Sequence, residues 1–403
     1  MMIVVVLLFV LSSGCYNAMA TADKIQQKEN IHPPVIEWLI SEDVGGYFNT
    51  ESIAVRNGGM YASKDIRKGD SIMKIPPEAL IYNKESDEED ECETARRLVY
   101  EYDVLGEEKS FYWPYLQYVF ESFPHRTVPL GWTKEGKKIL RSIVGRSSLP
   151  RSYGRACGDD NSGSLPKFES DPDLFEAAFR IVLSRGWHHV MVPVYDMVNH
   201  RNYHRDQSDG GGHNIDRSST LHNPSLNLDV DGDFQIEALR DIKRGDQLHN
   251  SYNQCHDITC DDIDTSYITS SIFIDYGFVE DYPRRFAFHT DNDEHDPYLG
   301  IVVEIVSDKE MNFILPSSPS ELNEHQVNWL QDELEHTFQK KNKTTERIER
   351  HKYQHSNEDN SDDDKQQKQH EAYMLLEYYN ALTEAIELTV KSTTTTTTKD
   401  NEL

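Results

Sequence analysis

Two copies of one short pattern, far apart in the chain, constrain the fold more than any other feature. Residues 62–72 (ASKDIRKGDSI) and 238–248 (ALRDIKRGDQL) share Ala, a basic residue, Asp, Ile, two basic residues, Gly, Asp and an aliphatic residue in the same order. Each copy is typical of two strands joined by a tight turn. Gly69 and Gly245 lie in the turn, where glycine can adopt a positive φ without steric cost. Two copies so far apart are no tandem array, so we expect two similar corners of one β domain.

Short strands and helices alternate around these corners. Residues 52–76 are rich in short apolar runs broken by turns, and strands are expected again at 190–195 and 234–239. Helical spacing of apolar residues follows Asp171, an N-cap residue with proline after it. Beyond residue 284, two apolar stripes at helical spacing flank a polar stretch. We therefore predict a small helical domain over 284–390, with a polar connector at 340–370.

Charge and hydropathy narrow the function classes. The chain has 403 residues with 41 Lys and Arg against 70 Asp and Glu, a net charge of −29. Such an acidic chain is a poor match for the phosphate backbone of nucleic acid, so no nucleic-acid partner is expected. No apolar run reaches the length of about 20 residues that a membrane-spanning helix needs, so no stable membrane span is expected.

Both ends of the chain resemble targeting signals. The apolar run Ile3–Leu11, followed by Ala18-Met19-Ala20, predicts a signal peptide over 1–20; a buried strand or a membrane anchor is the alternative. Residues 391–403 form a Thr-rich tail whose last two residues match a receptor-read retention sequence. We expect the secretory pathway, in the lumen of the endoplasmic reticulum, with secretion as the alternative. In that oxidising lumen Cys255 and Cys260 could pair.

Three more segments stand far apart in the sequence: 195–200 (YDMVNH), 249–252 (HNSY) and 275–279 (DYGFV). Together with the strands and turn of 57–75, they resemble the SET-domain methyltransferases. More narrowly, they resemble the branch that contains the Rubisco large-subunit lysine methyltransferase and the actin-histidine methyltransferase. The resemblance implies a mixed β+α fold: short sheets around a pseudoknot-like active site over 35–283, a helical insertion at about 94–185, and a helical C-terminal domain that resembles a substrate-binding domain.

The resemblance also implies a role for individual residues. Tyr252 corresponds to the active-site tyrosine, and Trp187 and Tyr195 belong to an aromatic substrate channel. Arg185 would meet the carboxylate of S-adenosylmethionine. The full set of implied cofactor contacts is Gly59, Arg185, Asp196, Met197, Asn199, His200, Tyr276, Gly277 and Phe278.

We therefore expect an S-adenosylmethionine-dependent protein-lysine N-methyltransferase that acts on a non-histone protein. Lysine is favoured over histidine because Trp187 stands where the histidine-modifying relative has a polar amide. Asn253 replaces the glycine that usually follows the tyrosine, and 255–264 is an insertion. A catalytically inactive module that binds a peptide or protein partner is therefore an alternative, as is a protein-histidine methyltransferase. His204, His213 and His222 lack close ligand spacing, so no metal is expected.

Overall fold

The computed structural model describes sixteen stretches of the chain. They are residues 33–56, 58–82, 91–122, 128–144, 157, 171–187, 189–200, 204–205, 215–216, 221–222, 233–250, 252, 268–288, 301–316, 318–354 and 362–399. The predicted signal peptide at 1–20 and the last four residues of the tail lie outside the described residues.

The two copies of the repeated pattern pair with each other. Ile66 and Ile242 form an antiparallel bridge. Across it, the backbone N–H of Lys68 donates to Asp241 Oδ1 over 2.9 Å, and that of Arg244 donates to Asp65 Oδ1 over 2.8 Å. Each aspartate thus binds the turn of the other copy, and both turn glycines have a positive φ, 84° and 95°. The expected pair of β corners is confirmed, and the shared Asp and Gly positions are explained by this reciprocal contact.

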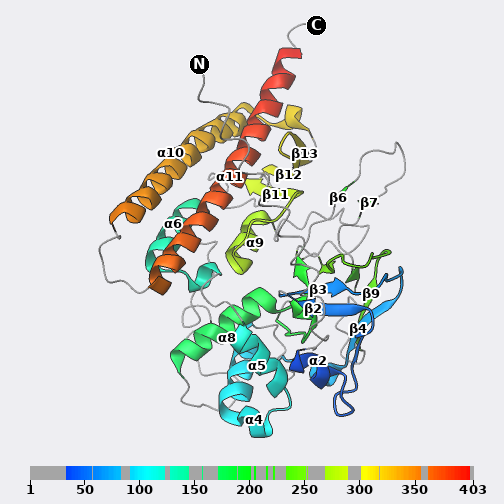
Figure 1. Ribbon diagram of the computed structural model, residues 1–403. Coiled ribbons are helices and arrows are strands. Elements are labelled where there is room, and N and C mark those ends of the chain that lie inside the picture. The colour runs from blue at the N-terminus through cyan, green and yellow to red at the C-terminus, as the bar shows by residue number, and fades with distance from the viewer. Residues whose placement is uncertain are drawn as a thin grey trace, which may run out of the picture.

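Short sheets extend from these corners (Figure 1). The largest has the order β1-β4-β9-β8, with every pair antiparallel. Two smaller antiparallel pairs are β2 with β3 and β6 with β7, while β5 and β10 pair in parallel. Their bounds are β1 Tyr47–Phe48, β2 Ile53–Arg56, β3 Gly59–Ala62, β4 Ser71–Ile75, β5 Asn199–His200, β6 His204–Arg205, β7 Ile215–Asp216, β8 Leu221–His222, β9 Phe234–Ala238 and β10 His249–Asn250.

Helices cover one side of these sheets, as the predicted insertion requires. They are α2 Pro34–Leu39, α3 Glu91–Val99, a π-helical turn Tyr100–Leu105, α4 Gly106–Lys109, α5 Trp113–Ser122 and α8 Pro172–Arg185. Helix α6, Lys134–Val144, lies instead beside the C-terminal helices. Asp171 caps α8 by accepting a hydrogen bond from the backbone N–H of Asp173 over 2.9 Å. The predicted start of this helix is therefore confirmed.

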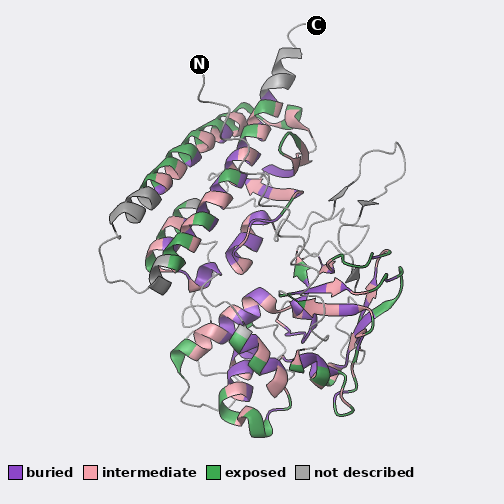
Figure 2. Ribbon diagram, in the orientation of Figure 1, coloured by how far each residue is buried: buried purple, intermediate pink, exposed green. Residues whose placement is uncertain are grey.

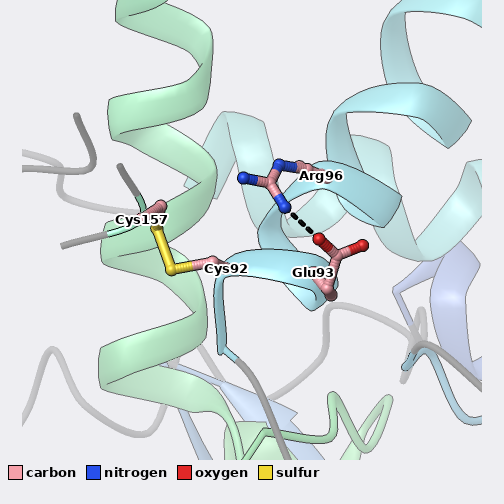
Figure 3. Close-up of a disulfide and its surroundings, with 4 residues drawn as sticks. All are labelled: Cys92, Glu93, Arg96 and Cys157. Atoms are coloured by element: carbon pink, nitrogen blue, oxygen red, sulfur yellow. Dashed lines mark hydrogen bonds and ion pairs between the residues drawn. A yellow bond between two sulfur atoms is a disulfide. The ribbon is translucent and has the colours of Figure 1, made fainter. Parts of the chain in front are cut away.

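A disulfide joins Cys92, at the start of α3, to Cys157 (Figure 3). The two cysteines are 65 positions apart in sequence, and Cys92 is buried. Beside them Arg96 forms an ion pair with the buried Glu93. The bond closes a large loop of the helical insertion, which restricts the unfolded chain. The expected pair, Cys255 and Cys260, lies outside the described residues.

The C-terminal domain is helical over most of its length, as predicted for 284–390, and it also contains strands that the sequence did not indicate. It opens with an antiparallel sheet of order β11-β12-β13, with bounds Arg284–Phe288, Ile301–Ser307 and Glu310–Leu315. Strand β12 is buried along its first five residues, Ile301 to Ile305. A strand buried on both faces lacks the alternation of polar and apolar residues that marks a strand in sequence, and this is why it was missed.

Two long helices complete this domain as an antiparallel hairpin (Figure 1). Helix α10 spans Glu324–Gln354 and α11 spans Asp362–Lys399, so most of the predicted connector at 340–370 is helical. Much of the Thr-rich tail is also helical, because α11 continues to Lys399. Thr389 and Thr393 donate their hydroxyls within this helix, each over 2.7 Å, to the carbonyls of Ala385 and Val390. Among the described residues, no helix is both long and apolar enough to span a bilayer.

Two hydrophobic cores underlie these layers. The first lies beneath the short sheets and the helices around them, and the second beneath β11–β13 and α11. Trp132 and Leu140 belong to the second core, as does Phe273 of α9 (Thr269–Tyr276). No residue of α9 is exposed (Figure 2). Helices α6 and α9 therefore pack with the C-terminal domain, although they precede the predicted boundary at 283.

Candidate active site

Three segments that are distant in sequence meet at one place. Strands β5 and β10 pair in parallel, with His249 opposite Asn199 and Asn250 opposite His200. The turn before β3 reaches the same place, where Asn199 Nδ2 donates to the carbonyl of Gly58 over 3.4 Å. The structure thus joins the predicted cofactor turn, the Asn-His pair and the segment that ends at Tyr252.

Gly59 packs closely against two side chains at this meeting point, so a larger residue here would require them to shift. A Cβ at this position would lie 2.6 Å from Gln247 Nε2 and 2.9 Å from Asn199 Nδ2. Both distances are shorter than real Cβ contacts. The missing side chain therefore gives the backbone close access to the Asn199 amide, which is what a cofactor-binding turn requires.

Tyr252 is held at both its backbone and its hydroxyl. Its N–H donates to His200 Nδ1 over 2.8 Å, and its hydroxyl donates to the carbonyl of Val198 over 2.8 Å. Burial raises the pKa of this hydroxyl above its ordinary value. The side chain is therefore a neutral phenol near pH 7, so it can orient a reacting group by hydrogen bonding but is no general base.

An aromatic cluster surrounds Tyr252. The ring of Tyr276 lies 4.5 Å away and that of His200 4.9 Å away, measured between centroids. Phe278 lies 5.9 Å from His200 and 6.1 Å from Tyr276. Gly277, with φ 76°, ends α9 in the left-handed conformation and turns the chain between these two aromatic residues. The predicted segment 276–278 is thus beside the predicted tyrosine.

Trp187 and Tyr195 belong to a second aromatic group. Their ring centroids are 5.7 Å apart, and both contact Phe234. The hydroxyl of Tyr195 accepts a hydrogen bond from Asn250 Nδ2, which links this group to β10. Tyr195 is buried in the first core and Trp187 packs against that core. Both residues thus pack with the first core, and their place in a substrate channel stays a prediction.

Arg185 and Asp196 form a buried pair. Arg185 Nη1 lies 3.2 Å from Asp196 Oδ2, which also accepts from the Tyr115 hydroxyl over 3.1 Å. The Asp196 carboxylate has no exposed surface, and burial raises its pKa, against the lowering effect of Arg185. The prediction that Arg185 meets a cofactor carboxylate stays a prediction, but this ion pair orients the guanidinium.

Asp196 lies on a 3₁₀ turn, Tyr195–Met197, and Met197 of this turn packs in the first core.

Val194 begins this turn in a strained conformation. Its φ is 70°, although it is β-branched and fully buried. Such a backbone costs about 1–3 kcal/mol and persists only where the surroundings enforce it. No sequence signal marks it, because valine is not a residue that indicates positive φ. The strain lies directly before Asp196 and the Asn-His pair.

The sequence from 57 to 253 matches the family model of the SET domain. This segment is a SET domain. It contains Gly59, the Asn199-His200 pair and Tyr252, while the aromatic segment 276–278 follows it. The family assignment therefore agrees with the resemblance found in the sequence.

Two solved structures are similar to the chain over most of its length. One is the SET domain of LSMT bound to lysine and AdoHcy, at 16% identity and a TM-score of 0.45, covering 89% of this chain and 92% of the other. The second is Rubisco LSMT bound to sinefungin and monomethyllysine, at 16% identity and a TM-score of 0.48, covering 89% of this chain and 93% of the other. No curated protein matches the sequence.

Some predictions fall on residues that the structure does not describe. Asn253, the insertion at 255–264 and His213 lie outside the described residues, and only the backbone of His204 and His222 is described. Within the described part of the chain, no group of three or more His, Cys, Asp or Glu side chains forms a metal site. Glu280, which contacts His200, was missed; its signal was an acidic residue directly after the apolar run that ends at Val279.

Proposed function

We propose that the protein is an S-adenosylmethionine-dependent methyltransferase that modifies lysine side chains of a non-histone protein. One observation carries the proposal: inside a SET domain, the neutral hydroxyl of Tyr252 is held on the carbonyl of Val198, directly before Asn199 and His200. A hydroxyl fixed in this way, next to a backbone carbonyl, makes a preorganised polar environment for a transferring methyl group.

The residues around the turn fit the cofactor. Because Gly59 has no side chain, its backbone lies close to the Asn199 amide, which a Cβ would displace. We infer that S-adenosylmethionine would be held by Gly59, Asn199 and His200. The Arg185–Asp196 pair, whose aspartate shortly precedes Asn199 in the sequence, would position a charged group of the cofactor. When bound, the cofactor supplies an electrophilic methyl group. The protein contributes binding, orientation and exclusion of water.

The aromatic cluster explains how a lysine becomes reactive. A lysine amine attacks only when it has lost its proton, which ordinarily requires a pH near 10. The rings of Tyr252, Tyr276 and Phe278 form an apolar surround that lowers the pKa of an entering amine by desolvation. They also align it, and alignment of the reacting atoms supplies much of the rate in a displacement of this kind.

Lysine is favoured over histidine because of the side chain at 187. Trp187 packs in an aromatic group with Tyr195 and Phe234 and offers no amide to hold an imidazole ring. A catalytically inactive module that binds a protein partner is the second candidate, because Asn253 replaces the usual glycine after Tyr252. The experiment below separates the three outcomes.

We further propose that the protein acts in the secretory pathway, in the lumen of the endoplasmic reticulum. The apolar segment at 1–20, the retention-like end of the chain and the Cys92–Cys157 disulfide support this location, since disulfides persist in oxidising compartments. Expression of a chain that ends before Lys399 tests whether the C-terminal residues are a retention signal. Secretion of the shortened chain would support this role, and unchanged retention in the endoplasmic reticulum would contradict it.

Substrate labelling tests the activity. The purified protein is incubated with S-adenosylmethionine carrying a deuterated methyl group and an extract of endoplasmic-reticulum lumen, and labelled peptides are mapped by mass spectrometry. The proposal predicts label on lysine side chains. Label on histidine rings would favour the histidine-modifying alternative. A folded protein that binds the cofactor and transfers no label would favour the inactive module.

A further inference from the structure

His200 uses both of its ring nitrogens in the active site. Nδ1 accepts the backbone N–H of Tyr252 over 2.8 Å, so this nitrogen must carry a lone pair. Nε2 lies 3.1 Å from Glu280 Oε2, so Nε2 carries the proton and donates it to this carboxylate. The two contacts together specify a single state: a neutral imidazole protonated on Nε2.

The surroundings of Glu280 favour its role as the acceptor of the His200 Nε2–H hydrogen bond. Its side chain and that of His200 are each only 2% exposed. The second carboxylate oxygen accepts from the hydroxyl of Thr269, which in turn accepts the backbone N–H of Arg285 over 2.9 Å. Because both neighbours donate, an ionised carboxylate satisfies both contacts, whereas an amide can accept at one oxygen only.

The backbone around Glu280 is also fixed. Arg284 Nε donates to the Glu280 carbonyl over 2.7 Å, and Thr269 is the first residue of α9. The other end of α9 carries Tyr276, whose ring lies against that of Tyr252 in a tilted arrangement. Glu280 therefore lies where α9, β11 and the β5–β10 pair meet, and it is linked through His200 to the backbone N–H of Tyr252.

We propose that Glu280 is a positioning residue that acts through His200 to hold Tyr252 against the carbonyl of Val198. The inference rests on the proposed function, because it deepens the role of the same site. Without Glu280, the His200 ring can rotate or exchange its proton between nitrogens. A proton on Nδ1 removes the acceptor of the Tyr252 N–H, and the tyrosine loses the anchor that fixes its backbone.

The test compares Glu280→Ala, Glu280→Gln and Glu304→Ala with the natural protein. Glu304 is the matched control, because it is also buried and pairs with an arginine, Arg285, in the same domain. Glu280→Gln is the conservative variant: its amide oxygen can still accept from His200 Nε2, so it should keep the tautomer.

The first readout is long-range ¹⁵N–¹H NMR of protein labelled at histidine, with His200→Asn to assign the signal. The natural protein, Glu280→Gln and Glu304→Ala should show His200 as the Nε2–H tautomer, whereas Glu280→Ala should show a mixture of tautomers. An unchanged tautomer in Glu280→Ala would overturn the inference, as would an equal change in Glu304→Ala. This readout decides the inference even if the protein transfers no methyl group.

The second readout is methyl transfer to poly-L-lysine as the probe substrate. A displacement of about 1 Å near the reacting atoms costs about 100-fold in rate, so Glu280→Ala should lower kcat by about that factor while KM for S-adenosylmethionine changes by less than about threefold. Glu280→Gln should restore most of kcat. Full activity in Glu280→Ala would contradict the inference alone. Lack of cofactor binding by the natural protein would contradict the proposed function instead.

Discussion

At the scale of single residues, the hydroxyl of Tyr252 is the group on which the chemistry depends. Tyr252→Phe keeps the ring that packs against Tyr276 and removes the donor to Val198. We expect methyl transfer to fall by about 100-fold, as when one preorganised hydrogen-bond donor is lost. Cofactor affinity, measured by calorimetry, should stay within about threefold. Unchanged transfer would contradict the role given to Tyr252.

Gly59 gives a second test at this scale. In Gly59→Ala the new Cβ displaces the amides of Gln247 and Asn199, so we expect the affinity for S-adenosylmethionine to fall about tenfold, or about 1.4 kcal/mol. Gly69→Ala is the control, since nothing lies within 4 Å of its Cβ position and its positive φ affects stability only. Equal affinities of the two variants would show that Gly59 is not part of the cofactor site.

At the scale of elements, Glu371 on α11 holds the start of α6. The backbone N–H of Thr133 donates to Oε1 over 2.7 Å, and its hydroxyl donates to Oε2 over 2.6 Å. Glu371 is buried, so Glu371→Ala leaves two donors unpaired and should lower the free energy of unfolding by about 1–3 kcal/mol. Urea denaturation measures it. Glu387→Ala, at an exposed position of the same helix, should change it by less than about 0.5 kcal/mol.

Individual elements show what the sequence could predict. The repeated corners and the start of α8 were found because Gly, Asp and Pro act locally, within one turn. Strand β12 was missed because a fully buried run has no periodicity, and the helical content of 340–370 was missed because polar composition does not distinguish a solvated helix from a linker.

The site likewise contains residues that the sequence could predict and residues that it could not. Tyr252, His200 and Tyr276 come together as predicted, because they belong to motifs in a recognisable order. Glu280, Val194 and the Cys92–Cys157 bond depend on partners that are far away in sequence and appear only in the folded chain. Tyr195 packs in the first core, and the sequence could not show this, since an aromatic residue has the same signature in a core and in a channel.

At the scale of the whole molecule, the disulfide links folding to compartment. Replacement of both Cys92 and Cys157 by alanine should lower the free energy of unfolding by about 2–4 kcal/mol, since the bond closes a long loop. Thermal unfolding with and without a reductant measures this. The reduced natural protein should match the double variant, and an unfolding temperature unaffected by reductant would contradict a structural role for the bond.

Alkaline pH gives a second whole-molecule test. Burial raises the pKa of Tyr115, Tyr252 and Tyr378 above the ordinary value of 10.0. Because the folded pKa is the higher one, stability is fully present below about pH 10 and is lost as pH rises toward the folded pKa, by about 1.4 kcal/mol per pH unit for each tyrosine.

The matched variants are Tyr378→Phe and Tyr373→Phe, both on α11. Tyr373 is 65% exposed and Tyr378 is buried. Urea denaturation at a series of pH values should show a shallower loss of stability for Tyr378→Phe alone. The same pH dependence in all three proteins would contradict the assignment.

The most direct test of the central claim is calorimetric titration of the purified protein with S-adenosylmethionine and S-adenosylhomocysteine. We expect a micromolar dissociation constant, which is a binding free energy of about −8 kcal/mol, and one site per chain. A protein that is folded by circular dichroism and binds neither compound would contradict it.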